Sequence, residues 1–124
     1  LAVAAGICML DAISEPGFYE NLGARAAQLM SGLRERAKAA GIPFTTNQVG
    51  GMFGCFFSAE DTVTNFAQVM ACNSEHFQRY FHAMLDGGVY LAPSAFEAGF
   101  ISMVHGDAEI AATLDAAEAA FNSL

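Results

Sequence analysis

The sequence IPFTTNQVGGMFGCFFS, residues 42–58, is the stretch that decides the fold class. Two runs rich in β-forming residues flank the pair Gly50-Gly51, and glycine accepts the positive φ angles of a tight hairpin turn. The stretch therefore predicts an antiparallel β-hairpin. Gly54, inside the second run, indicates that another backbone or side chain passes close to it.

Helical patterns precede this hairpin. Residues 1–13 are predicted to form one helix. Residues 14–17 are predicted to end this helix and begin the next one, because Pro16 is tolerated in a first helical turn. A second helix follows and ends at Gly41. Its apolar residues recur at three- and four-residue spacing: Leu22, Ala26, Leu29, Met30, Leu33 and Ala37.

Helical and extended patterns alternate after the hairpin. Residues 59–72 fit no period and are predicted as a loop that could contain a short strand or turn. Asn73 is a good N-cap for a third helix, which ends at Gly87-Gly88. The apolar stripe of this helix consists of Phe77, Tyr80, Phe81, Met84 and Leu85.

The last third of the chain is predicted to contain two short strands, at residues 89–91 and 100–104, and a final helix capped by Asp107. The buried face of this helix is expected to consist of Ile110, Leu114, Ala117 and Phe121. The order of elements predicts a single α+β domain over residues 1–124, with a small antiparallel or mixed sheet and helices packed on one face.

Composition narrows the functions that are open to the chain. The net charge is −8, with 13 acidic and 5 basic residues, and such a surface opposes nucleic acid. No apolar run reaches the ~20 residues that a membrane helix needs. Because 54% of the residues are hydrophobic, the surplus apolar surface is expected to contact other protein. Neither nucleic acid nor a membrane is a predicted partner.

Cysteine and histidine give no metal or redox motif. Cys8, Cys55 and Cys72 are far apart in the sequence, which favours buried free thiols in a reducing cytoplasm. His76 and His82 lie six residues apart on one predicted helix and point in different directions, so they cannot bind one metal ion. No metal site is predicted.

The sequence LAPSAFEAGF, residues 91–100, contains one acid, Glu97, among small and aromatic residues. No lysine or arginine follows Arg79, so this carboxylate has no cationic partner nearby in the sequence. Two interpretations are open. Glu97 could reach water from a strand end, or it could be a site residue that binds a ligand amine or another domain.

Residues 72–110, CNSEHFQRYFHAMLDGGVYLAPSAFEAGFISMVHGDAEI, resemble the C-terminal domain of the glutamate-1-semialdehyde 2,1-aminomutase family, a class III aminotransferase-like family of fold type I. The sequences NQVGGMFGCFF (47–57) and LAVAAG (1–6) also match family stretches. The resemblance implies that the chain is the small C-terminal domain of a pyridoxal-phosphate (PLP) enzyme. Residues 1–13 would then be an interdomain helix left from the junction with the large domain.

The resemblance also implies an activity. The family moves an amino group between adjacent carbons of glutamate 1-semialdehyde, through a diamine, to give the tetrapyrrole precursor 5-aminolevulinate. The Schiff-base lysine, the phosphate ligands and the acid facing the pyridine nitrogen belong to the family's large domain. No cofactor-binding residue is therefore predicted here, and PLP is not expected on this chain, whose only lysine, Lys38, is expected to be solvated.

Two residues carry over from the family motif. Glu97 is implied as a catalytic and substrate-binding residue, and Ser94 as a substrate-binding residue. Related aminotransferases tend to clamp a second substrate carboxylate with an arginine from this domain, whereas a glutamate would repel that acid and attract an ammonium group. The chain alone is expected to be inactive, and the complete enzyme to be a homodimer.

Other classes remain open at this stage. The chain could be the C-terminal domain of another class III aminotransferase, or a free-standing α+β module that binds, regulates or dimerises. The apolar helix at residues 1–13 is expected to be buried by a second copy of the chain.

Overall fold

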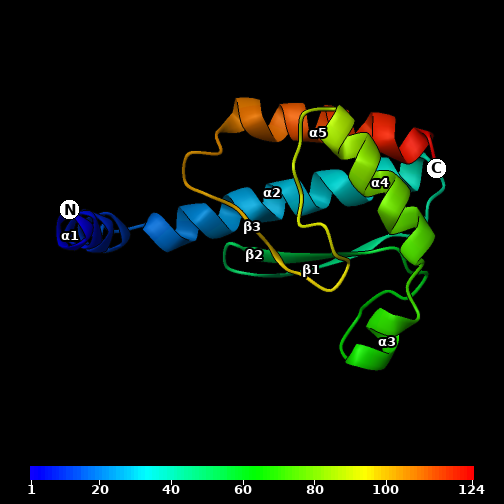
Figure 1. Cartoon of the computed structure of the whole chain (residues 1–124), viewed down its shortest axis with the longest axis horizontal. Helices are drawn as coiled ribbons and strands as arrows, with labels where there is room; N and C mark the ends of the chain where they lie inside the picture. The colour runs from blue at the N-terminus through cyan, green and yellow to red at the C-terminus, as the bar shows by residue number, and fades with distance from the viewer.

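The computed structural model describes all residues, 1–124, and contains five helices and three strands (Figure 1). In chain order these elements are α1 (Ala2–Ile13), α2 (Phe18–Ala39), β1 (Thr45–Val49), β2 (Met52–Phe56), α3 (Phe66–Met70), α4 (Ser74–Asp86), β3 (Gly99–Phe100) and α5 (Asp107–Asn122).

The strands form one antiparallel sheet in the order β1-β2-β3. The β1–β2 hairpin pairs Val49 with Met52, and its two-residue turn has Gly50 at a φ of 56°. The predicted hairpin is confirmed. A Cβ on Gly54 would lie 2.8 Å from the ring of Phe56, so the close neighbour expected at this glycine is an aromatic side chain on the same strand.

The two faces of the sheet have different neighbours. On one face, Thr46 accepts a 2.5 Å hydrogen bond from Arg34 of α2, and Gln48 donates to the carbonyl of Gly23, also on α2. On the other face, Asn47 donates to the carbonyl of Val63. In Figure 1, α2, α4 and α5 gather on one side of the sheet and α3 lies on the other. We call these the helix-covered face and the open face.

The core lies on the helix-covered face, between α2, α4 and α5. The apolar residues predicted for these helices supply most of it, and Tyr80 of α4 stacks on Phe121 of α5 with ring centroids 4.8 Å apart. Phe44 and Phe57 pack edge-on against the same cluster. The predicted α+β fold, with helices packed on one face, is confirmed.

Two of the predicted strands differ from the structure. Residues 89–91 pair with no strand, because the N–H of Val89 donates to the carbonyl of Met84 and ties this segment to the end of α4. The strand predicted at residues 100–104 is reduced to Gly99–Phe100. It ends early because turn hydrogen bonds begin at Ser102, whose carbonyl accepts from the N–H of His105.

Three local predictions are also corrected. Residues 59–72, predicted as loop, contain the short helix α3, whose N-cap Asn65 accepts from the N–H of Gln68. The N-cap of α5 is Gly106 rather than Asp107, and Glu109 of the first turn accepts from its N–H. Pro16 lies outside α2, because Gly17 is the N-cap at a φ of 83°.

Helix α1 projects away from the rest of the molecule (Figure 1), and none of its residues is buried. Its large apolar side chains, including Ile7 and Leu10, are exposed. Cys8 is exposed as well, so its predicted burial is wrong, whereas Cys55 and Cys72 are partly buried free thiols. No helix has the length and apolar character required to cross a bilayer.

Candidate functional site

Glu97 lies in a turn between α4 and β3. Its backbone N–H donates to the carbonyl of Ser94 at 3.2 Å, and the N–H of Phe96 donates to the Ser94 hydroxyl oxygen at 3.2 Å. Ser94 therefore shapes the turn with both its carbonyl and its hydroxyl. The Glu97 side chain is exposed and has no hydrogen-bond partner in the chain.

A cavity of about 300 Å³ opens beside this turn on the open face of the sheet, and Glu97 lines it. We call it the open-face cavity. Most of its wall is apolar, and its polar lining residues are Asn47, Gln48 and Glu97; Ser94 is not among them. Apolar and aromatic residues of β1, β2, α3 and the turn supply the rest, among them Val49, Phe56, Phe66 and Phe96.

Helix α3 supports the turn that carries Glu97. The ring of Phe66, the first residue of α3, contacts the ring of Phe96 with centroids 6.2 Å apart. The same helix closes one side of the cavity, since Val69 also lines it. The segment that was predicted as loop therefore forms part of the candidate site.

No cation faces Glu97. Each arginine is engaged elsewhere: Arg25 with the His105 carbonyl, Arg34 with Thr46, Arg36 with Glu118 at 3.6 Å, and Arg79 with the Ser123 carbonyl. Lys38 is exposed near the end of α2, as predicted, and does not line the open-face cavity. The negative charge at position 97 is therefore left unopposed beside an apolar wall.

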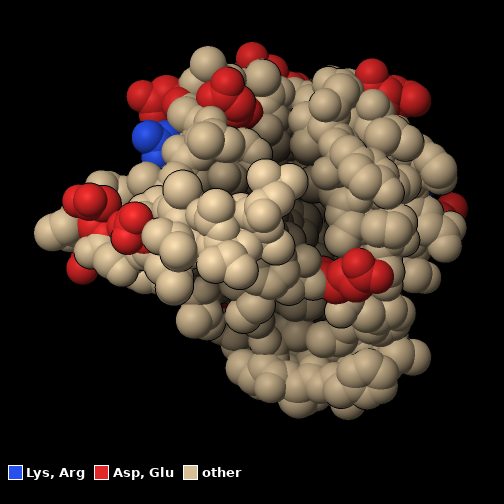
Figure 2. All heavy atoms as spheres, turned by 60° about the vertical axis from the view of Figure 1, so that its left-hand side comes forward, with Lys and Arg blue, Asp and Glu red and all other residues tan.

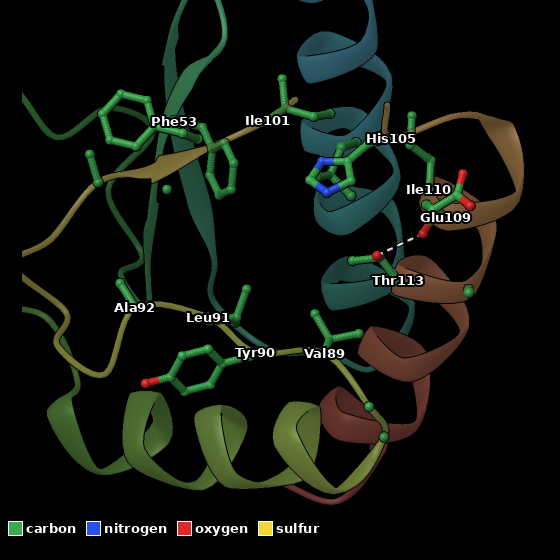
Figure 3. A pocket seen from close by; sticks show the side chains of 17 residues that line it. Phe53, Val89, Tyr90, Leu91, Ala92, Ile101, His105, Glu109, Ile110 and Thr113 are labelled. Atoms are coloured by element: carbon green, nitrogen blue, oxygen red, sulfur yellow. Dashed lines mark hydrogen bonds between the residues drawn. The ribbon is translucent and has the colours of Figure 1, made fainter. Parts of the chain in front are cut away.

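A larger cavity, of about 530 Å³, lies between residues 89–92, residues 98–101 and α5 (Figure 3). His105 reaches into it, with Nδ1 accepting from the N–H of Ser102 at 3.1 Å, and the Thr113 hydroxyl donates to the carbonyl of Glu109 at 2.7 Å. The remaining lining is mainly aliphatic and aromatic. Neither Glu97 nor Ser94 lines this cavity, which shares Phe53 and Ala98 with the open-face cavity.

One face of the molecule carries few charges near its centre. Figure 2 shows one face on which acidic residues lie mainly at the edge, uncharged residues fill the centre, and a hollow opens near the middle. His76 packs edge-on against Phe57, and no group of three or more His, Cys, Asp or Glu side chains is placed to hold a metal ion.

The residues present do not fit PLP as a resident cofactor. A Schiff base needs a lysine within a pocket, and the only lysine is exposed beside Arg34 at the far end of α2. The open-face cavity is lined by one carboxylate residue and two amide residues, with no cationic side chain for a phosphate.

Sequence reasoning singled out Glu97 but not Asn47, which lines the same cavity. The available signal was the two-residue alternation of β1, which places Thr45, Asn47 and Val49 on one face of the strand. That alternation does not say which face meets the turn at Glu97, fifty residues later. The chain must fold before the two residues become neighbours of one cavity.

Comparison with known proteins gives a fold. No family model matches the chain. It is similar to an omega-transaminase from Sphaerobacter thermophilus, with a TM-score of 0.69 and 22% identity over 86% of this chain and 24% of that one. It is also similar to the FumI protein of Sphingopyxis sp. MTA144, solved in its PLP internal aldimine form, with a TM-score of 0.75 and 27% identity over 97% of this chain and 26% of that one.

The chain thus spans about a quarter of the length of the structures it matches. Its fold is that of the C-terminal part of PLP-dependent transaminases, as the resemblance implied. The three-stranded antiparallel sheet and the helices on one of its faces are the shared architecture.

Proposed function

We propose that the chain is the C-terminal domain of a glutamate-1-semialdehyde 2,1-aminomutase, which uses PLP to convert glutamate 1-semialdehyde into 5-aminolevulinate for tetrapyrrole synthesis. The sequence LAPSAFEAGF supports this specific activity, and the transaminase-like fold supports the broader class. The chain alone is inactive in this proposal, because PLP is held by a part of the enzyme outside residues 1–124.

The observation that carries the proposal is the uncompensated carboxylate of Glu97 on the open-face cavity. An acid at this position attracts a substrate ammonium group and repels a second substrate carboxylate. The attraction strengthens when the rest of the enzyme covers the cavity and excludes water. Ser94 acts by holding the turn, since its hydroxyl and carbonyl both accept backbone hydrogen bonds there.

The second candidate is another class III aminotransferase, favoured by the structural match to an omega-transaminase. The two candidates differ in the group that this domain presents to the substrate. An enzyme that accepts dicarboxylic substrates gains from a bidentate arginine clamp, whereas no arginine or lysine lines the open-face cavity. The acidic cavity therefore favours the aminomutase.

We also propose that the complete enzyme is a homodimer in which the exposed apolar residues of α1 meet other protein. The support is the continuous apolar surface of this helix, which has no buried residue in the chain by itself.

The test of the activity is Glu97→Gln in the complete enzyme. Because the substitution keeps the size of the side chain and removes its charge, kcat/KM for glutamate 1-semialdehyde is expected to fall about tenfold to a hundredfold, the range for a lost charged hydrogen bond. The measurement is steady-state formation of 5-aminolevulinate.

Glu75→Gln is the matched control, since Glu75 is an exposed acid on α4 that does not line the open-face cavity. It is expected to keep wild-type kinetics. Wild-type turnover by the Glu97 variant, or absence of 5-aminolevulinate formation by the unmodified complete enzyme, would overturn the proposal.

A further inference from the structure

The open-face cavity contains another polar side chain, that of Asn47, which lies outside the stretch 91–100 that carries Glu97. We infer that Asn47 is a specificity-determining residue of this cavity, and that its Oδ1 atom and the Glu97 carboxylate together recognise an aliphatic ammonium group. The inference deepens the proposed function and rests on it, because it assigns the ligand chemistry of the same site.

The orientation of the Asn47 side chain is fixed by its partner. Its Nδ2 atom lies 2.6 Å from the carbonyl oxygen of Val63, which can only accept a hydrogen bond. The nitrogen must therefore face Val63, and the Oδ1 atom receives no hydrogen bond from any group of the chain. Asn47 thus presents an acceptor whose position is held by a tether on the loop before α3.

The neighbouring polar residue does not share this role. Successive side chains of a strand point to opposite faces, so the Gln48 side chain lies on the helix-covered face. There its Nε2 atom donates to the carbonyls of Gly23 at 2.8 Å and Gly50 at 2.9 Å. Its side chain is therefore directed away from the open face, and its backbone alone can line the cavity. Asn47 and Glu97 are the two polar side chains left to meet a ligand.

Every feature of this cavity favours a cation. Its two polar side chains accept hydrogen bonds, one of them carries a negative charge, and no lysine, arginine or histidine lines the cavity. The rings of Phe56, Phe66 and Phe96 form part of the wall, and aromatic faces attract ammonium groups. A carboxylate or phosphate finds no side-chain donor there and is repelled by Glu97.

The ligand class is therefore a primary aliphatic amine in its ammonium form, with a short body that fits about 300 Å³. One ammonium group has three N–H donors and can satisfy both acceptor side chains, so a monoamine and a diamine both fit the site. The alcohol of the same shape can donate to the same oxygens but lacks the charge that Glu97 and the rings attract.

The test is titration of the 124-residue chain with 1,2-diaminopropane, 1,2-propanediol and propionate, followed by amide chemical shifts in NMR spectra. The diamine is expected to shift the resonances around Asn47 and Glu97 and to bind at least tenfold more tightly than the diol or propionate. Equal binding of the three probes, or diamine shifts located elsewhere, would overturn the inference.

Two substitutions distinguish ligand recognition by Asn47 from a purely structural role of its hydrogen bond to Val63. Asn47→Leu and Asn47→Asp both remove the hydrogen bond to Val63, so a tether predicts that both weaken diamine binding alike. Recognition predicts opposite signs: Leu, without an acceptor, weakens binding about tenfold, while Asp, with an added charge, strengthens it severalfold. Asn21→Leu, at an exposed position of α2 that does not line the cavity, is the control and is expected to change the diamine Kd less than twofold.

The same variants in the complete enzyme distinguish failure of this inference from failure of the proposed function. Asn47→Leu is expected to raise KM for glutamate 1-semialdehyde more than it lowers kcat. If Glu97→Gln lowers turnover while the Asn47 variants behave as wild type in binding and kinetics, only the role of Asn47 is wrong. If Glu97→Gln also retains wild-type turnover, the proposed function falls as well.

Discussion

The two faces of the sheet use similar residues for different purposes. On the helix-covered face, Phe121 of α5 is 1% exposed and stacks on Tyr80, whereas on the open face Phe66 is 70% exposed and its ring contacts Phe96. Phenylalanine therefore forms the core on one side and lines a cavity on the other. The buried core and the proposed recognition site therefore lie on opposite sides of one small sheet.

Polar and charged side chains are also distributed differently between the two faces. The core cluster contains no ionised side chain, while Glu97 and Asn47 both lie on the open face, where water or a ligand can reach them. Changes on the open face can therefore alter binding with little effect on folding, and changes on the helix-covered face should do the reverse.

The sharpest way to break this comparison is to make the same substitution on both faces. Phe121→Ala should lower the free energy of unfolding by about 3–5 kcal/mol, since it leaves a cavity beside Tyr80. Phe66→Ala removes an exposed ring and should cost less than about 1 kcal/mol. Urea denaturation followed by circular dichroism measures both values, and equal losses would contradict the division.

A smaller effect is expected from alkaline pH, which acts on the helix-covered face. Burial raises the pKa of the Cys55 thiol to about 12 and raises the pKa of Tyr80 above its ordinary value, with Cys55 adding to the Tyr80 shift. In the unfolded chain these groups ionise near pH 8.5 and 10. The unfolded state therefore loses protons first, and the free energy of unfolding should fall above about pH 9.

The expected slope is roughly 1.4 kcal/mol per pH unit for each group between its unfolded and folded pKa values. Urea denaturation at pH 7, 9, 10 and 11 measures it. Cys55→Ala should reduce the slope between pH 9 and 10 without abolishing it, because burial also raises the pKa of the Cys72 thiol, while Cys8→Ala, at an exposed position, should leave the slope unchanged. Constant stability up to pH 11 would show that the face is open to water.

The smallest effect on stability is expected in α1, which belongs to neither face. Ile7→Glu together with Leu10→Glu should weaken self-association, because both side chains are exposed on an apolar helix, yet should change the free energy of unfolding by less than about 0.5 kcal/mol. Sedimentation velocity across concentrations measures the association. Ala24→Glu, at an exposed position of α2, is the control and should leave association unchanged.

A wild-type chain that sediments as a monomer at high concentration would contradict the proposed role of α1. Loss of folding in the Ile7 and Leu10 double variant would contradict the separation of this helix from the core.

The amino-acid sequence alone determined the elements whose signals are local. The spacing of apolar residues predicted the buried faces of α2 and α5, Asn73 was found as the N-cap of α4, and Gly50-Gly51 marked the β1–β2 turn. Each of these depends on residues a few positions apart, so the sequence pattern and the folded contact coincide.

Tertiary structure decided the rest, because the competing interactions come from distant residues. Residues 89–91 have the composition of a strand, but the Val89 N–H bonds to Met84 and no neighbouring strand offers a partner. Asn47 and Glu97 line one cavity only because β3 pairs with β2 of the hairpin and α3 forms one side of that cavity. A sequence pattern predicts which face of its own strand a side chain occupies. Only tertiary packing determines which distant residues lie against that face.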